Sequence, residues 1–149
     1  LKSWVPTSDP LECPDEVSIF VSESIVTTNS DGDHILELYI KNNGRFNIGG
    51  FYFYGSNSTE QKIGTIDLSL PNTFIPGGSQ NKRGSIITLD IADLNPFYVG
   101  DKYGFEFNLS NIDGKIESID IIPMRNQKHE DKYRTVTCGN AKITRKINY

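Results

Sequence analysis

Short runs of alternating apolar and polar residues recur along the whole chain. Leu36, Leu38 and Ile40 alternate with more polar residues, and residues 102–109 repeat the pattern with three aromatic residues and a leucine at every second position. A period of two is typical of a strand with one buried face. Because apolar residues never recur at helical spacing for more than a turn or two, the pattern predicts a chain built of strands.

The stretch 36–54 holds two of these predicted strands. Asn43-Gly44 separates an alternating run from a β-branched and aromatic run that ends at Tyr54. Asn-Gly is typical of a tight turn because both residues tolerate positive φ. The stretch is therefore either a hairpin or a close connection between two sheets. In the same way, Asp113-Gly114 predicts a hairpin turn between strands at 102–109 and 115–122.

Further strands are predicted at residues 17–22, 61–68, 85–91, 133–138 and 141–147. The Pro-, Asn- and Gly-rich residues 71–84 predict a long loop, and residues 93–101 and the charged residues 127–131 predict two more. About eight to nine short strands at regular spacing indicate an all-β fold, an antiparallel immunoglobulin-like β-sandwich. We expect residues 1–14 to form an extended proline-rich segment and residues 15–149 to form a single sandwich domain.

The composition restricts the classes of partner. The chain has 149 residues, enough for one domain with a real core, and a formal net charge of −4. A nucleic-acid binder needs a basic stripe that neutralises phosphates, so we expect no nucleic-acid partner. No apolar run is long enough to span a bilayer. Any export or anchoring segment is expected outside this chain.

Two cysteines, Cys13 and Cys138, lie near opposite ends of the chain. Cys13 precedes the first predicted strand and Cys138 follows a late one, so a disulfide would tie the two ends of the domain together. Closing so long a loop contributes roughly 5 kcal/mol in the chain-entropy model. The alternative is a pair of buried free thiols. Neither cysteine belongs to a Cys-x-x-Cys pair, which argues against redox catalysis.

Two N-glycosylation sequons stand at Asn57, in a predicted turn, and at Asn108, at a predicted strand end. Together with the expected disulfide, they favour an extracellular or cell-surface location. Attached glycans would shield the surface at these two positions.

Residues that commonly carry catalysis or bind metals are scattered. His34 and His129 are isolated, so no zinc site is expected, and Asp31-Gly32-Asp33 lacks the spaced ligands of an EF-hand and predicts a turn. We expect no cofactor, metal or catalytic site.

Three carboxylates carry the alternative hypothesis of an enzyme. A glycosidase would need Asp90, Asp93 and Asp120 to converge in a cleft, whereas such carboxylates are usually solvated surface groups. We therefore predict that the protein is not an enzyme.

Tyrosines are the candidates for ligand contact. Tyr52 and Tyr54, with Tyr39, Tyr98 and Tyr103, would line a sugar-binding face if exposed, and would otherwise pack on the sheets. Trp4 would either dock on the domain or belong to an interface. Trp4, Tyr52 and Tyr54 are the candidate ligand or interface residues.

Four segments together resemble a known family. They are Cys13-Pro-Asp-Glu-Val-Ser-Ile-Phe, the Leu-x-Leu-x-Ile-Lys-Asn-Asn-Gly-x-x-x-Ile-x-Gly-Phe stretch from Leu36 to Phe51, Lys115-Ile-Glu-Ser-Ile-Asp-Ile-Ile-Pro123, and the closing Cys138. The combination is similar to the exported immunoglobulin-like head domain of the archaeal type IV pilin and archaellin superfamily, over Cys13 to about Ile143. Members carry an N-terminal hydrophobic helix that assembles into the filament core. That helix is absent from this chain.

The resemblance implies a non-enzymatic extracellular structural protein that self-associates into a filament or surface assembly. Edge strands or the N-terminal segment would make the contacts, and membrane contact would come only through a segment absent from this chain. The alternative is a carbohydrate-binding or adhesion module on the cell surface. It would use exposed tyrosines and the 71–84 loop.

Overall fold

The protein is an antiparallel β-sandwich, as the sequence predicts. The computed structural model describes residues 12–57, 64–90 and 92–149, almost all of them in strands, turns and loops. The strands are β1 (Ile19–Thr28), β2 (His34–Asn42), β3 (Gly50–Ser56), β4 (Ile66–Asp67), β5 (Phe74–Ile75), β6 (Asn81–Arg83), β7 (Ile86–Thr88), β8 (Lys102–Asn108), β9 (Ser118–His129), β10 (Lys132–Thr137) and β11 (Ile143–Lys146). Two 3-10 turns, η1 (Leu109–Asn111) and η2 (Gly139–Ala141), complete the described elements.

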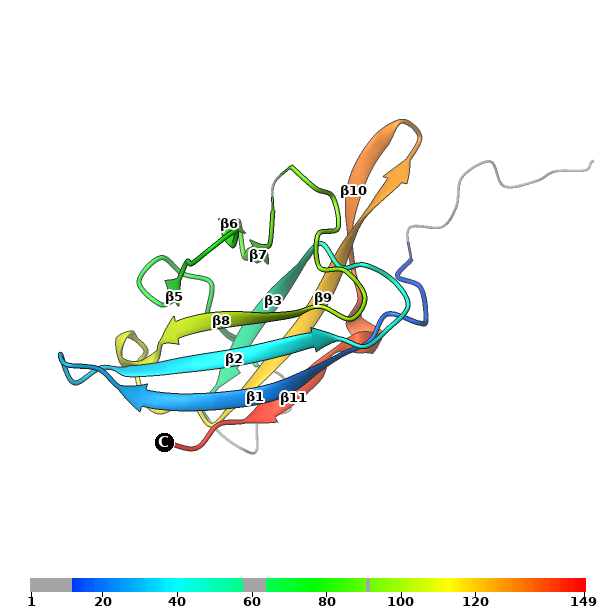
Figure 1. The fold of residues 1–149 in the computed structure, drawn as a ribbon. Coiled ribbons are helices and arrows are strands. Elements are labelled where there is room, and N and C mark those ends of the chain that lie inside the picture. The colour runs from blue at the N-terminus through cyan, green and yellow to red at the C-terminus, as the bar shows by residue number, and fades with distance from the viewer. Residues whose placement is uncertain (1–11, 58–63, 91) are drawn as a thin grey trace, which may run out of the picture.

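Two sheets form the layers of the sandwich (Figure 1). One has the strand order β1-β2-β8-β5, and the other has the order β10-β9-β3-β7-β6, with β11 paired to β9 and β4 to β3. The described strands outnumber the eight or nine predicted because the loop predicted at 71–84 contains the short strands β5 and β6. Of the strand predicted at 61–68, only Ile66–Asp67 is a described strand, and residues 61–63 lie outside the described residues.

The connection from β2 to β3 crosses between the sheets. β2 pairs with β1 and β8, whereas β3 pairs with β9, so the hairpin alternative for residues 36–54 is wrong and the inter-sheet connection is correct. The fully buried Asn42 directs the crossing. Its amide donates to the carbonyl oxygens of Phe46 and Phe97, and its Oδ1 accepts the N–H of Gly44 at 3.0 Å.

Gly44 is required at this crossing by close packing, and its φ is not positive. A Cβ there would lie 2.5 Å from both the Glu16 carbonyl oxygen and the Ser18 nitrogen. The Asn-Gly sequence therefore allows two backbone segments to touch, which differs from the positive-φ turn that the sequence predicts.

The second predicted hairpin turn, at Asp113-Gly114, is also a crossing. After β8 the chain makes the turn η1 and then enters β9 in the other sheet, so β8 and β9 are not hairpin partners. Gly114 does adopt a left-handed φ of 81°. The dipeptide therefore does form a turn, but a local dipeptide does not determine which sheet the next strand joins.

Among the described strands, hairpins join β1 to β2, β6 to β7 and β9 to β10. Asn29 links β1 and β2, where its Oδ1 accepts the N–H groups of Asp31 and Asp33, in keeping with the predicted turn. The charged loop predicted at 127–131 is instead mostly strand: β9 runs to His129, and only Glu130 and Asp131 form the turn. Both have positive φ, at 51° and 66°, which a two-residue turn of this twist needs.

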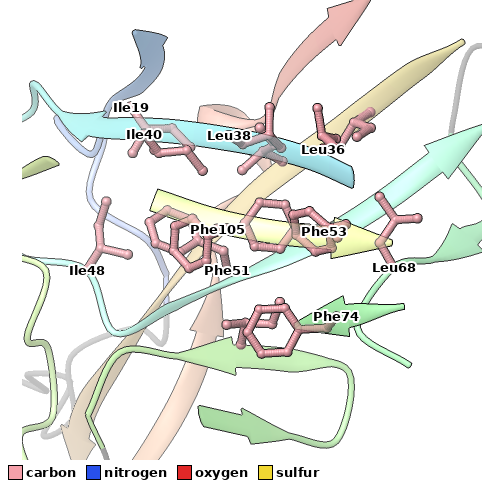
Figure 2. Packing of buried hydrophobic residues seen from close by; sticks show 14 of the residues in the cluster. Ile19, Leu36, Leu38, Ile40, Ile48, Phe51, Phe53, Leu68, Phe74 and Phe105 are labelled. Atoms are coloured by element: carbon pink, nitrogen blue, oxygen red, sulfur yellow. The ribbon is translucent and has the colours of Figure 1, made fainter. Parts of the chain in front are cut away.

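Phenylalanines from both sheets fill the space between them (Figure 2). The rings of Phe51 and Phe53 on β3 lie 5.4 and 5.0 Å from that of Phe105 on β8. Phe53 also lies 5.0 Å from Phe107, and all four are fully buried. Leu36, Leu38 and Ile40 of β2 are buried as well, as their alternation predicts.

The predicted disulfide is confirmed. Cys13 and Cys138 are joined over a separation of 125 residues, and Cys138 is fully buried. The bond ties the segment before β1 to the end of β10. Such bonds persist in oxidising compartments, so the disulfide supports an extracellular type of environment. Among the described residues, no helix has both the length and the apolar character needed to cross a bilayer.

Replacing both cysteines (C13S/C138S) is expected to lower the free energy of unfolding by up to about 5 kcal/mol, because the unfolded chain regains the entropy of an open loop. Urea unfolding with and without reductant measures the effect. Reductant should destabilise the wild type and leave the double variant unchanged. Equal stability of the oxidised wild type and the variant would contradict the account.

Candidate functional site

A hollow of about 420 Å³ opens on the outer face of the larger sheet. It lies where β3 begins, between β6 and β7 on one side and the β9–β10 hairpin on the other. β6 contributes Lys82 and Arg83, and the loop after β7 contributes Asp90 and Asp93. The hollow therefore draws its walls from segments that are far apart in the sequence.

The β9–β10 hairpin supplies the opposite wall. Asn126 on β9 pairs in register with Thr135 on β10, and Lys128 pairs with Tyr133 two residues further along. Because side chains two residues apart share a face, Thr135 and Tyr133 point to the same side and both line the hollow. The side chain of Tyr133 is 57% exposed.

Gly49 allows this wall to approach the loop after β7. A Cβ at Gly49 would lie 2.8 Å from the carbonyl oxygen of Leu94 and 2.9 Å from the side-chain nitrogen of Asn126. Leu94 and Asn126 both line the hollow. A glycine inside an aromatic strand pattern thus marks a close backbone approach at the edge of the site.

A hydrogen-bond network holds the hairpin wall in place. Arg83 donates to the Thr135 hydroxyl at 3.2 Å, and that hydroxyl donates to Asn126 Oδ1 at 3.0 Å. Asn126 also donates to the Leu94 carbonyl oxygen at 2.7 Å and exchanges two hydrogen bonds with Asn95. β6, the hairpin and the loop after β7 are therefore linked through side chains before any ligand arrives.

The charges of the hollow are not neutralised by ion pairs within the site. In the described part of the chain, the one ion pair within 4.0 Å joins His129 to Glu130, away from the hollow. Asp93 accepts a hydrogen bond from the Tyr98 hydroxyl, and this bond raises the pKa of that phenol. Asp90 and Asp93 also accept the N–H groups of Ala92 and Asn95, at 2.9 and 3.2 Å. A bound molecule would therefore use the remaining lone pairs of these carboxylates and the remaining N–H groups of the two cations.

Of the three carboxylates considered for catalysis, two line the hollow and one does not. Asp90 and Asp93 lie in it, whereas the buried Asp120 is a structural group. Its two oxygens accept from the Thr144 hydroxyl at 2.6 Å and from the N–H of Gly64 at 2.8 Å. The three therefore do not converge in one cleft.

Metal ligands are also dispersed. No group of three or more His, Cys, Asp or Glu side chains that could hold a metal ion occurs within residues 12–57, 64–90 and 92–149. His34 contacts the ring of Tyr149, at 5.0 Å between centroids, and His129 lies at the end of β9.

The candidate ligand tyrosines, Tyr52 and Tyr54, lie outside the hollow. They sit half-buried on the outer face of β3 with their rings stacked at 6.3 Å, and Thr137 donates to the Tyr52 hydroxyl at 3.5 Å. Trp4, the third candidate, lies outside the described residues.

The two predicted glycosylation acceptors differ in accessibility. Asn57 is exposed just after β3. Asn108 is half-buried, and its amide donates to Asp33 at 3.1 Å while its Oδ1 accepts the N–H of Ser110. The Ser110 hydroxyl of the same sequon accepts the N–H of His34 at 2.8 Å. A glycan on Asn108 would have to displace the amide contact to Asp33, so Asn57 is the more accessible acceptor.

Nothing in the sequence marks Tyr133, Arg83, Asn126 or Thr135 as site residues. Each occurs in an ordinary polar strand pattern, and only the fold brings them together. The one available signal was Gly49-Gly50, a glycine pair at the start of an aromatic run.

Comparison with known proteins gives no relative. No protein family matches the chain, and neither the curated proteins nor the solved structures contain a significant match. The function therefore has to be inferred from the residues and the geometry of this chain alone.

Gly49→Ala is expected to lower the free energy of unfolding by about 1–3 kcal/mol, because the new methyl group overpacks the contact with Leu94 and Asn126. Gly77→Ala is the matched control, since a Cβ at Gly77 meets nothing within 4 Å. The control should change stability by less than about 0.5 kcal/mol. Chemical denaturation of both variants provides the measurement, and equal effects would refute the assigned role of Gly49.

Proposed function

We propose that this chain is the head domain of an extracellular structural protein, a filament subunit of the archaeal pilin and archaellin type. It acts by display and by packing against further copies of itself, without catalysis. The disulfide-closed sandwich supports this proposal because it suits a domain that must hold its shape outside the cell.

The observation that carries the proposal is an acidic band on the outer face of the smaller sheet. Glu37 on β2 stands directly opposite Glu106 on β8, and Glu23 on β1 stands opposite Tyr39. Like charges directly across a sheet destabilise it. The described residues place no cation within ion-pair distance of these carboxylates. A cationic partner covering the band would relieve the repulsion.

The surroundings of the band fit a protein contact. Phe20 and Ile25 on β1 are 39% and 37% exposed on the same face. The pKa of the Tyr39 phenol is raised, first by the charge of Glu37, then by burial and by the charges of Glu23 and Glu106. Lys102 Nζ lies 5.9 Å from the centre of the Tyr39 ring, but no ion pair joins it to the carboxylates of the band. Exposed apolar groups beside unpaired carboxylates are typical of a binding surface.

The chain itself offers the complementary surface. β11, an outer strand of the larger sheet, carries the exposed cations Arg145 and Lys146, and the exposed Lys142 precedes it. Contact between the acidic band of one copy and this basic edge of the next is heterologous, because two different patches meet. Heterologous contacts that do not close into a ring produce filaments.

Pairing through the outer edge of β1 is less suited to assembly. β1 has a register shift between Val21 and Glu23 in its pairing with β2. Such bulges twist an edge away from intermolecular strand pairing. Contact through the face of the sheet, rather than through this strand edge, is therefore the form of packing we propose.

Charge reversal tests the proposal in the full-length product in its native cells. E37K/E106K should abolish surface filaments, as seen by electron microscopy, because the acidic band becomes repulsive to the basic edge. D15K/E16K makes the same charge change at two exposed residues outside the band and should leave filaments intact.

A compensating variant tests whether the two patches contact each other directly. Adding R145E/K146E to E37K/E106K should restore filaments by exchanging the two charges. The proposal fails if wild-type cells form no filament containing this chain, or if both charge-reversed variants assemble equally well.

A further inference from the structure

The hollow on the larger sheet has no part in the proposed packing. The acidic band lies on the other sheet, and the basic edge is formed by β11, whose residues do not line the hollow. A preformed cavity of about 420 Å³ falls in the size range of small-ligand sites, roughly 300–1,000 Å³. The chemistry of its walls indicates which class of molecule would fit.

The walls present donors and acceptors together. Lys82 and Arg83 donate hydrogen bonds, Asp90 and Asp93 accept them, and the Thr88 hydroxyl on β7 does both. A ligand that satisfies all of these must itself donate and accept at several closely spaced positions. The hydroxyl groups of a sugar have this property. A simple anion or cation would be repelled by one half of the site.

Tyr133 supplies an apolar surface beside these polar groups. The residue is more than half exposed, and its partner in register on β9 is Lys128. A phenol ring combines an apolar face with a polar tip, so it can lie against the C–H face of a sugar while its hydroxyl remains in water. The ring and the polar wall border the same hollow.

The site is rigid before binding. The bonds from Arg83 to Thr135 and from Thr135 to Asn126 fix the hairpin relative to β6. The two-way pairing of Asn126 with Asn95 fixes the loop after β7. Pre-organised walls lose little conformational entropy on binding, which favours a weakly held ligand such as a sugar.

Other ligand classes fit less well. The two carboxylates lie beside two cations, and the described residues contain no group of three or more metal-ligating side chains. The net charge of −4 disfavours polyanions.

We propose that this hollow binds neutral saccharides, with Tyr133 stacking on a sugar ring and Arg83, Asp90 and Asp93 binding its hydroxyl groups. The site would let the displayed domain adhere to glycans on another surface. This inference stands independently of the filament proposal, because it uses different residues and a monomeric domain would bind equally well.

The test uses the disulfide-bonded chain on an array of neutral glycans, followed by titration of the best-binding glycan. Tyr133→Ala should weaken binding about tenfold or more, because the stacking surface is lost. Arg83→Ala should weaken it to a similar degree. Phe20→Ala, an exposed aromatic on the opposite sheet, is the control and should leave affinity unchanged.

Unfolding curves separate a binding defect from a folding defect, because an exposed Tyr133 should contribute little to stability. The proposal is overturned if no neutral glycan binds the wild type. It is also overturned if neither Tyr133→Ala nor Arg83→Ala weakens binding more than Phe20→Ala does. Loss of filaments in the charge-reversed variants with retained glycan binding would confirm that the two surfaces act separately.

Discussion

The phenylalanine contact between the two sheets is the interaction on which the rest of the structure depends. Phe51 and Phe53 from one sheet interleave with Phe105 and Phe107 from the other at ring-centre distances near 5 Å. Each ring buries a large apolar surface, and the tilted and edge-to-face arrangements favour one mutual geometry over sliding. The packing therefore fixes the orientation of one sheet relative to the other. The positions of the surface features on both sheets depend on this orientation.

Five crossings between the described strands and one disulfide keep this packing in place. Among the described strands, the chain passes between the sheets after β2, β4, β5, β7 and β8, so strands of the two sheets alternate along the chain. The Cys13–Cys138 bond joins the segment before β1 to the end of β10. Held this way, the sandwich presents two chemically different outer faces: an acidic band around Tyr39 on one and a polar hollow beside Tyr133 on the other. A domain with separate faces can assemble through one and remain available for binding through the other.

The sequence predicts the strands of this fold better than their partners. Alternation identifies the buried sides of β2 and β8, because period two reports which side chains point inward. The dipeptides Asn43-Gly44 and Asp113-Gly114 indicate only that the backbone changes direction. At both places the chain crosses from one sheet to the other. The candidate site is less predictable still. Arg83 lies on β6, and Asn126 and Tyr133 lie on the β9–β10 hairpin. These two segments meet only in the folded protein, and no local pattern encodes that meeting.

Native-state hydrogen exchange tests the central claim, that the interleaved phenylalanines make the two sheets one cooperative unit. The account predicts that the slowest amides of β2 and β8 and those of β3 and β9 exchange with the same opening free energy. They should also share the same denaturant dependence, because neither pair can open alone. Two distinct opening free energies, with one sheet exchanging while the other stays protected, would contradict it.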